Sequence, residues 1–129
     1  MATSYITEAG ARAADEMFGE RGRELMEQNG RDWVQRVDDD WAHTITDWII
    51  NGCYARGVLP TSTRELCAVA ALTALGRTRE LEAHVRIALN SNPAEQVREV
   101  ILQMAVYGGV PVALEGMRAF ERVAADSAQ

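Results

Sequence analysis

The stretch STRELCAVAALTALG, residues 62–76, decides the fold. Its first four residues form a capping box, in which Ser62 is the expected N-cap and Glu65 stands three positions later. The residues that follow are almost all apolar, and Gly76 marks the end of the segment. We therefore expect a central helix that is buried on all sides and is followed by a tight turn.

The rest of the chain also repeats its apolar residues at helical spacing, and it contains no alternating run that would predict a strand. Thr78 is the expected N-cap of the next helix, and Asn92 to Glu95 form a second capping box with Pro93 at the first helical position. We expect a first helical segment over about residues 7–28, with a break near Gly19 or Gly22. Further helices are expected over about residues 31–52, 65–75, 79–89, 93–107 and 112–125.

These elements predict the all-α class, as one domain over residues 1–129: a bundle of about six helices, with residues 1–30 as an N-terminal extension of unassigned role. The composition, 47% hydrophobic and 25% charged, is typical of a soluble protein, and the N-terminus lacks the pattern of a signal peptide, so we expect a cytoplasmic protein. The net charge of −6 argues against nucleic acid and membrane as partners. All 13 basic residues are Arg, which excludes a lysine Schiff base.

Four ionisable residues surround the turn after the central helix. Glu65, Arg77, Glu80 and His84 follow one another at spacings of twelve, three and four. In an antiparallel hairpin, Glu65 would face the far part of the second helix, where it can meet His84 and hold the imidazole in one tautomer. In the plainer interpretation, Glu65 caps its helix and Arg77 is a solvated turn residue. Glu80 and His84 then form an exposed pair on one helix.

Several short motifs along residues 57–120 together resemble the carboxymuconolactone decarboxylase family. They are R-E-L at 64–66, A-x-x-A-L-G at 71–76, E-L-x-x-H at 80–84, E-V-x-x-Q at 99–103 and Y-x-G-x-P at 107–111. The resemblance implies an alkylhydroperoxidase D-like helical fold and a homo-oligomer, a trimer or hexamer, with the site near subunit contacts.

The family has two branches, and residues 77 and 80 distinguish between them. The peroxidase branch carries two cysteines at the positions of Arg77 and Glu80, so thiol peroxidase activity is not expected. The decarboxylase branch lacks them and acts on a small carboxylated unsaturated lactone without metal or cofactor. By this resemblance His84 is the proton donor and acceptor, and Glu65 its orienting partner. From its charge we add Arg77 as the group that binds the substrate carboxylate.

Two other interpretations stay open: a non-catalytic helical oligomer that serves as a binding or scaffold protein, and a thiol peroxidase that uses Cys53 or Cys67. For the two cysteines we expect buried apolar roles. Glu80 and Tyr107 are further candidates for substrate binding, although Tyr107 could equally be a packed helix end.

Two patterns in the second helical segment favour structural roles. His43 lies among Asp39, Asp40 and Asp47, which we interpret as a solvated helix face in preference to a metal site. The stripe of Trp41 and Trp48 is more typical of a core or a subunit contact than of a substrate wall.

Overall fold

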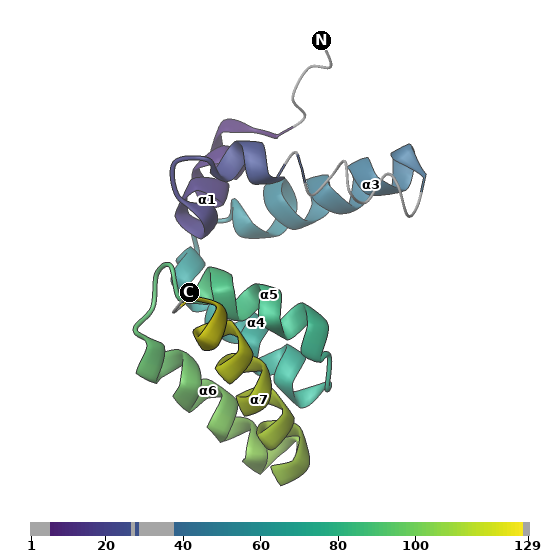
Figure 1. Cartoon of the computed structure of the whole chain (residues 1–129). Helices are drawn as coiled ribbons and strands as arrows, with labels where there is room; N and C mark the ends of the chain where they lie inside the picture. Colours follow the sequence, from purple (N-terminus) through teal and green to yellow (C-terminus); the bar gives the residue numbers. More distant parts are fainter. Residues whose placement is uncertain (1–5, 27, 29–37, 128–129) are drawn as a thin grey trace. The chain divides into compact units, whose positions relative to one another are not determined.

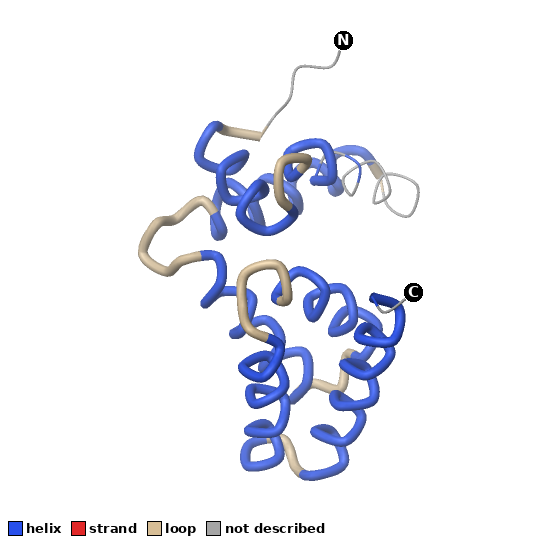
Figure 2. Tube along the Cα trace, turned by 60° about the vertical axis from the view of Figure 1, so that its left-hand side comes forward, coloured by secondary structure: helices blue, strands red, loops and turns tan. Residues whose placement is uncertain are grey.

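A computed structural model describes residues 6–26, 28 and 38–127 of the chain, and in these residues it shows helices and no strand (Figures 1 and 2). The all-α prediction is therefore confirmed. None of the helices in the described ranges is long and apolar enough to cross a membrane. The contacts divide the chain into two compact units, an N-terminal unit of residues 1–61 and a C-terminal unit of residues 62–129. Each unit is described by itself, and the single domain stays a prediction.

In the N-terminal unit, helix α1 (Glu8–Phe18) packs against the π-helix η1 (Asp47–Tyr54), which continues directly from α3 (Asp39–Thr46). Thr7 is the N-cap of α1, and both its backbone N–H and its hydroxyl donate to Oδ1 of Asn51, each at 3.0 Å. The predicted break is confirmed, because α1 ends before Gly19, whose φ is +82°. The expected start of the second helix, at residues 31–37, lies outside the described residues.

The tryptophan stripe of this unit is exposed. Trp41 and Trp48 are 60% and 73% exposed, because they lie on faces of α3 and η1 that no other part of the described chain covers. The expectation that they are core residues is wrong for the single chain, whereas a role in a subunit contact stays a prediction.

The C-terminal unit is built from four helices: α4 (Thr61–Ala74), α5 (Thr78–Ala88), α6 (Ala94–Tyr107) and α7 (Val110–Ser127). Helix α7 packs against both α5 and α6 (Figure 1). Each helix contributes fully buried apolar side chains to one core. The core residues are Val69, Leu81, Val85, Ala88, Val97, Ile101, Ala119 and Val123. Gly116 lets α7 approach closely, since a Cβ there would lie 2.8 Å from side-chain atoms of both Ile101 and Thr73.

The helix ends differ from three capping predictions. Helix α4 begins at Thr61, so Ser62 lies inside the helix and is not its N-cap. Thr78 is the first residue of α5, and the N-cap position belongs to Arg77. At α6 the N-cap position belongs to Pro93, with no side-chain capping bond. The Asn92 side chain instead donates to carbonyls of α4 and α5. Such shifts of one residue arise because a cap and its neighbour offer similar local signals.

Helix α4 is buried on one side only, which corrects the expectation of burial on all sides. Its buried residues Thr61, Glu65, Val69 and Thr73 recur every four positions. By contrast, Cys67 and Ala71 of the same helix are exposed. The contacts with the other helices lie on this stripe, because Glu65 meets His84 of α5 and Thr73 lies against Gly116 of α7.

Candidate active site

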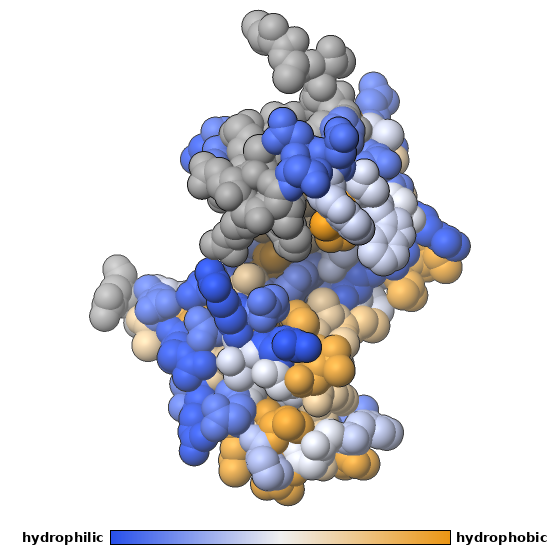
Figure 3. Space-filling view, turned by 90° about the vertical axis from the view of Figure 1, so that its right-hand side faces the viewer, coloured by the Kyte–Doolittle hydropathy of each residue, from blue (hydrophilic) through white to orange (hydrophobic). Residues whose placement is uncertain are grey.

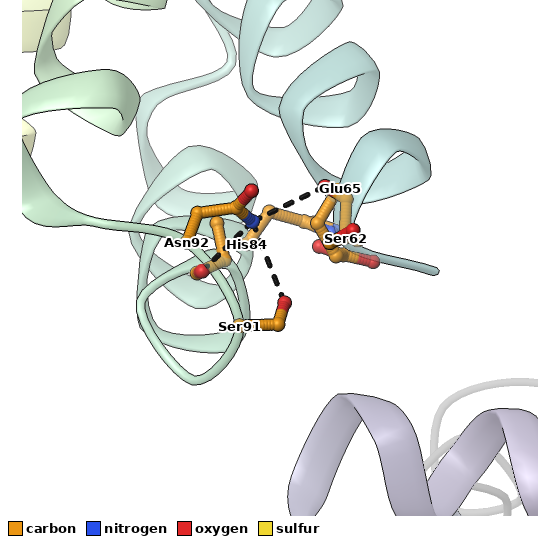
Figure 4. A network of polar contacts seen from close by, with 6 residues as sticks. Ser62, Glu65, His84, Ser91 and Asn92 are labelled. Carbon is orange, nitrogen blue, oxygen red and sulfur yellow. Dashed lines mark hydrogen bonds and ion pairs between the residues drawn. The ribbon is translucent and has the colours of Figure 1, made fainter. Parts of the chain in front are cut away.

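Glu65 and His84, which the sequence predicts to meet across the hairpin, are in contact. Nδ1 of His84 on α5 lies 2.8 Å from Oε2 of Glu65 on α4 (Figure 4). The Glu65 side chain is completely buried, and the His84 side chain is 29% exposed. An ionised carboxylate only accepts hydrogen bonds, so Nδ1–H of His84 donates. This contact fixes one tautomer and leaves Nε2 available for proton transfer.

The positions of the two residues along their helices favour an ion pair. Glu65 stands one turn from the N-terminal end of α4, and His84 stands one turn from the C-terminal end of α5. The helix dipole favours a negative charge near the first end and a positive charge near the second. A carboxylate without water around it also needs a partner, because an isolated buried charge is costly. The site can therefore hold an imidazolium next to a buried carboxylate.

Asn92, in the turn between α5 and α6, completes the polar network of Figure 4. Its side-chain Nδ2 donates to the carbonyl of Ser62 on α4, at 3.1 Å, and to the carbonyl of Ala88 on α5, at 3.0 Å. It also lies 3.4 Å from Oγ of Ser91. Sequence reasoning missed this role, because an asparagine before Pro-Ala-Glu has the signature of a helix cap.

Arg77 and Glu80 are exposed at the start of α5. They precede His84 by seven and four residues, which places all three on one side of that helix. Arg77 is roughly 10 Å from His84 along the helix axis at 1.5 Å per residue. The structure therefore aligns Arg77 and Glu80 with His84 without bringing them into the Glu65–His84 contact, and their roles in substrate binding stay predictions.

Tyr107 lies at the end of the C-terminal unit away from the pair. It is 74% exposed, which is not the packed helix end considered from the sequence. The next residue, Gly108, packs against Ala74, since a Cβ at Gly108 would lie 3.2 Å from Cα of Ala74. Ala74 is nine residues beyond Glu65, roughly 13 Å along α4. The substrate-binding role of Tyr107 stays a prediction that the geometry of the single chain does not support.

The remaining candidate residues do not form a second site. Among the residues that the structure describes, no group of three or more His, Cys, Asp or Glu side chains is arranged to hold a metal ion, and His43 is exposed. Cys53 and Cys67 are both exposed, and neither forms a disulfide. The expectation that the cysteines are buried is thus wrong, because each lies on a helix face without a covering layer.

The fold and the site define a class: all-helical proteins in which neighbouring helices of a hairpin bring a buried carboxylate to a histidine. Within that class, this chain belongs to the carboxymuconolactone decarboxylase family, whose model matches residues 42–122. The resemblance seen in the sequence is thereby confirmed, together with the alkylhydroperoxidase D-like helical fold.

A curated relative supports the same assignment. Over 74 residues the chain is 36% identical to a protein of Acinetobacter baylyi named 4-carboxymuconolactone decarboxylase. The matched region covers 57% of this chain and 55% of that protein. The chain thus spans about half the length of the relative it matches.

Proposed function

We propose that this protein is an acid–base enzyme that decarboxylates, or rearranges in a related way, a small unsaturated carboxylated lactone or carbonyl compound. The observation that carries the proposal is the hydrogen bond between Nδ1 of His84 and the fully buried carboxylate of Glu65. The name of the relative, 4-carboxymuconolactone decarboxylase, supports decarboxylation as the type of reaction. Isomerisation and ring closure use the same proton transfers and belong to the same proposal.

The reaction needs one well-placed proton. When the bond between carbon and the carboxylate breaks, its electron pair moves through the double bond into the conjugated carbonyl, and carbon dioxide leaves. The resulting enolate then takes a proton at carbon from Nε2 of protonated His84. Solvent later returns a proton to Nε2. Glu65 holds the ring and stabilises its positive charge through Nδ1–H. Such general acid catalysis contributes roughly 10²–10⁴ in rate.

Arg77 is the proposed partner of the substrate carboxylate. A guanidinium matches a carboxylate in shape and charge, and Arg77 stands on the same side of α5 as His84. The separation of roughly 10 Å along the helix is a span that an arginine side chain and a small substrate can cover together. Replacing Arg77 by Gln should therefore raise KM more than it lowers kcat.

The direct test measures turnover of a set of carboxylated lactones and enones by release of carbon dioxide and by the change in ultraviolet absorbance. We expect at least one compound to be consumed by the unmodified protein, and His84→Gln to lower kcat by about 10² or more. Full turnover by His84→Gln would remove the proposed role of the pair. A matched control is Gln103→Ala, an exposed change on α6, which should keep the rate.

The exposed apolar surface is also compatible with a second candidate, a non-catalytic helical oligomer that serves as a binding or scaffold protein. Figure 3 shows apolar side chains gathered at the lower end of the view, in the C-terminal unit. The exposed large hydrophobic residues in the turn after α4, on α6 and on α7 are Leu75, Leu102, Val106, Tyr107, Val110 and Leu114. A protein of this kind would keep its association state in the His84→Gln variant and would consume none of the compounds.

A further inference from the structure

Asn92 holds together the two helices that carry the acid–base pair. Its backbone N–H donates to the carbonyl of Ala88 at 2.9 Å, so the residue is fixed to the end of α5. From this anchor, its side-chain Nδ2 donates to the same carbonyl at 3.0 Å and, across the hairpin, to the carbonyl of Ser62 at 3.1 Å. One amide group thus joins α4 to α5.

The two carbonyls flank the acid–base pair. Ser62 precedes Glu65 by three residues on α4, and Ala88 follows His84 by four residues on α5. Each carbonyl therefore lies one helical turn from one partner of the pair. A bond between these two points limits how far the N-terminal turn of α4 can move from the C-terminal turn of α5. That separation in turn sets the distance from Glu65 to His84.

The contact uses the NH₂ group of a side-chain amide. The NH₂ group supplies two donors, one for each carbonyl, whereas a hydroxyl supplies one and a carboxylate supplies none. The neighbouring α6 gains nothing from the side chain, because its N-cap position is Pro93 and carries no side-chain bond. The half-buried amide is thus committed to the hairpin and not to the helix that follows it.

We propose that Asn92 is a positioning residue, which keeps the imidazole of His84 on the carboxylate of Glu65 by tying the two helix ends together. The inference rests on the proposed function for its effect on rate. Its structural part, the geometry of the imidazole, stands independently of any substrate.

The test compares Asn92→Ala with the unmodified protein by two readouts. The first is nuclear magnetic resonance of the histidine rings, in which an Nδ1–H bonded to a carboxylate gives its own proton signal. The chain has two histidines, so a His43→Gln variant assigns the spectrum. We expect the His84 signal to weaken or disappear in Asn92→Ala. The second readout is kinetic: kcat should fall about tenfold to a hundredfold, as small misplacements do, with KM within about twofold.

Arg86→Gln is the matched control. It removes another side-chain contact of α5, the exposed pair with Asp126 at 3.0 Å, on the side of α7. Both readouts should be unchanged in this variant. Should Asn92→Ala not fold, Asn92→Ser, which keeps one donor but cannot reach two carbonyls, makes the same comparison.

The outcomes separate the two proposals. An unchanged ring signal or an unchanged kcat in folded Asn92→Ala, with His84→Gln inactive, overturns the positioning role and leaves the acid–base function standing. No turnover by the unmodified protein on any compound counts against the function, while the ring signal still decides whether Asn92 orients His84.

Discussion

Glu65 is the unusual residue of this chain, because a fully buried carboxylate is rare without compensation. Here the compensation includes His84, and the 29% exposure of that side chain keeps the ring in contact with its surroundings. A carboxylate that is withdrawn from water and a histidine that is not make an asymmetric pair. In the proposed function, the carboxylate orients the imidazole and the histidine exchanges protons.

The burial of Glu65 allows a prediction about the free energy of unfolding. Removing His84 leaves the Glu65 carboxylate without this partner, so His84→Ala should lower the free energy of unfolding by about 1–3 kcal/mol. Adding Glu65→Leu to that variant should restore part of the loss, since a buried pair is often replaceable by apolar groups. Urea denaturation of the two single variants and the double variant measures the coupling. Strictly additive losses would mean that the two side chains do not interact.

Glu65→Gln separates the charge from the shape of the carboxyl group. The amide is similar in size, but its NH₂ can donate to Nδ1 of His84, which favours the tautomer that carries its proton on Nε2. We expect kcat to fall by about 10² or more while the protein stays folded. Steady-state kinetics measures the effect, with Glu95→Gln on the exposed side of α6 as the control. Equal loss in both variants would point to a general effect of charge.

At the scale of the elements, the hairpin of α4 and α5 shows what the sequence could predict. The spacing from Glu65 to His84 and the glycine between them were enough to predict the contact, because helix rise and a tight turn determine which residues face each other. The exposed side of α4 could not be predicted, since an apolar helix gives no sign of which neighbours are missing. The role of Asn92 was also hidden, because a capping asparagine and a tertiary amide donor look alike in sequence.

Gly76 supplies the backbone conformation that the turn of this hairpin requires. Its φ of +69° lies in the left-handed region, and no atom lies within 4 Å of a Cβ built there, so strain and not crowding opposes a side chain. Gly76→Ala should therefore cost about 1 kcal/mol in unfolding free energy, and Gly76→Asn less. Gly57→Ala is the control, because Gly57 has equally open space without a positive φ. Thermal unfolding compares the three, and equal midpoints for the two alanine variants would contradict the requirement.

At the scale of the whole molecule, the main feature is apolar surface that the single chain leaves open. In the C-terminal unit it gathers where α4 ends, α6 ends and α7 begins, as the packing of Gly108 on Ala74 shows. Large exposed apolar patches usually mark association surfaces. We therefore propose that the chain forms a homo-oligomer and that this end contributes to the contact. A trimer or hexamer is the assembly that the family resemblance implies.

Sedimentation measures the association directly. The expected mass is three or six times the 14.2 kDa of one chain. Val106→Glu should shift the mass towards that of the single chain, because it places a charge in an apolar contact. Arg98→Glu, an exposed change on the same helix, should leave the mass unaltered. A monomer at all concentrations would show that this surface has another use.

The hairpin has a consequence for how the chain tolerates cleavage. Glu65 and His84 both follow the connecting loop at residues 55–60 and lie within one span of 20 residues. A protease cut in that exposed loop would leave both partners on the same polypeptide. A cut at the Gly76–Arg77 bond would place them on separate peptides, held together by packing alone. The short turn is therefore the connection that the acid–base pair depends on most.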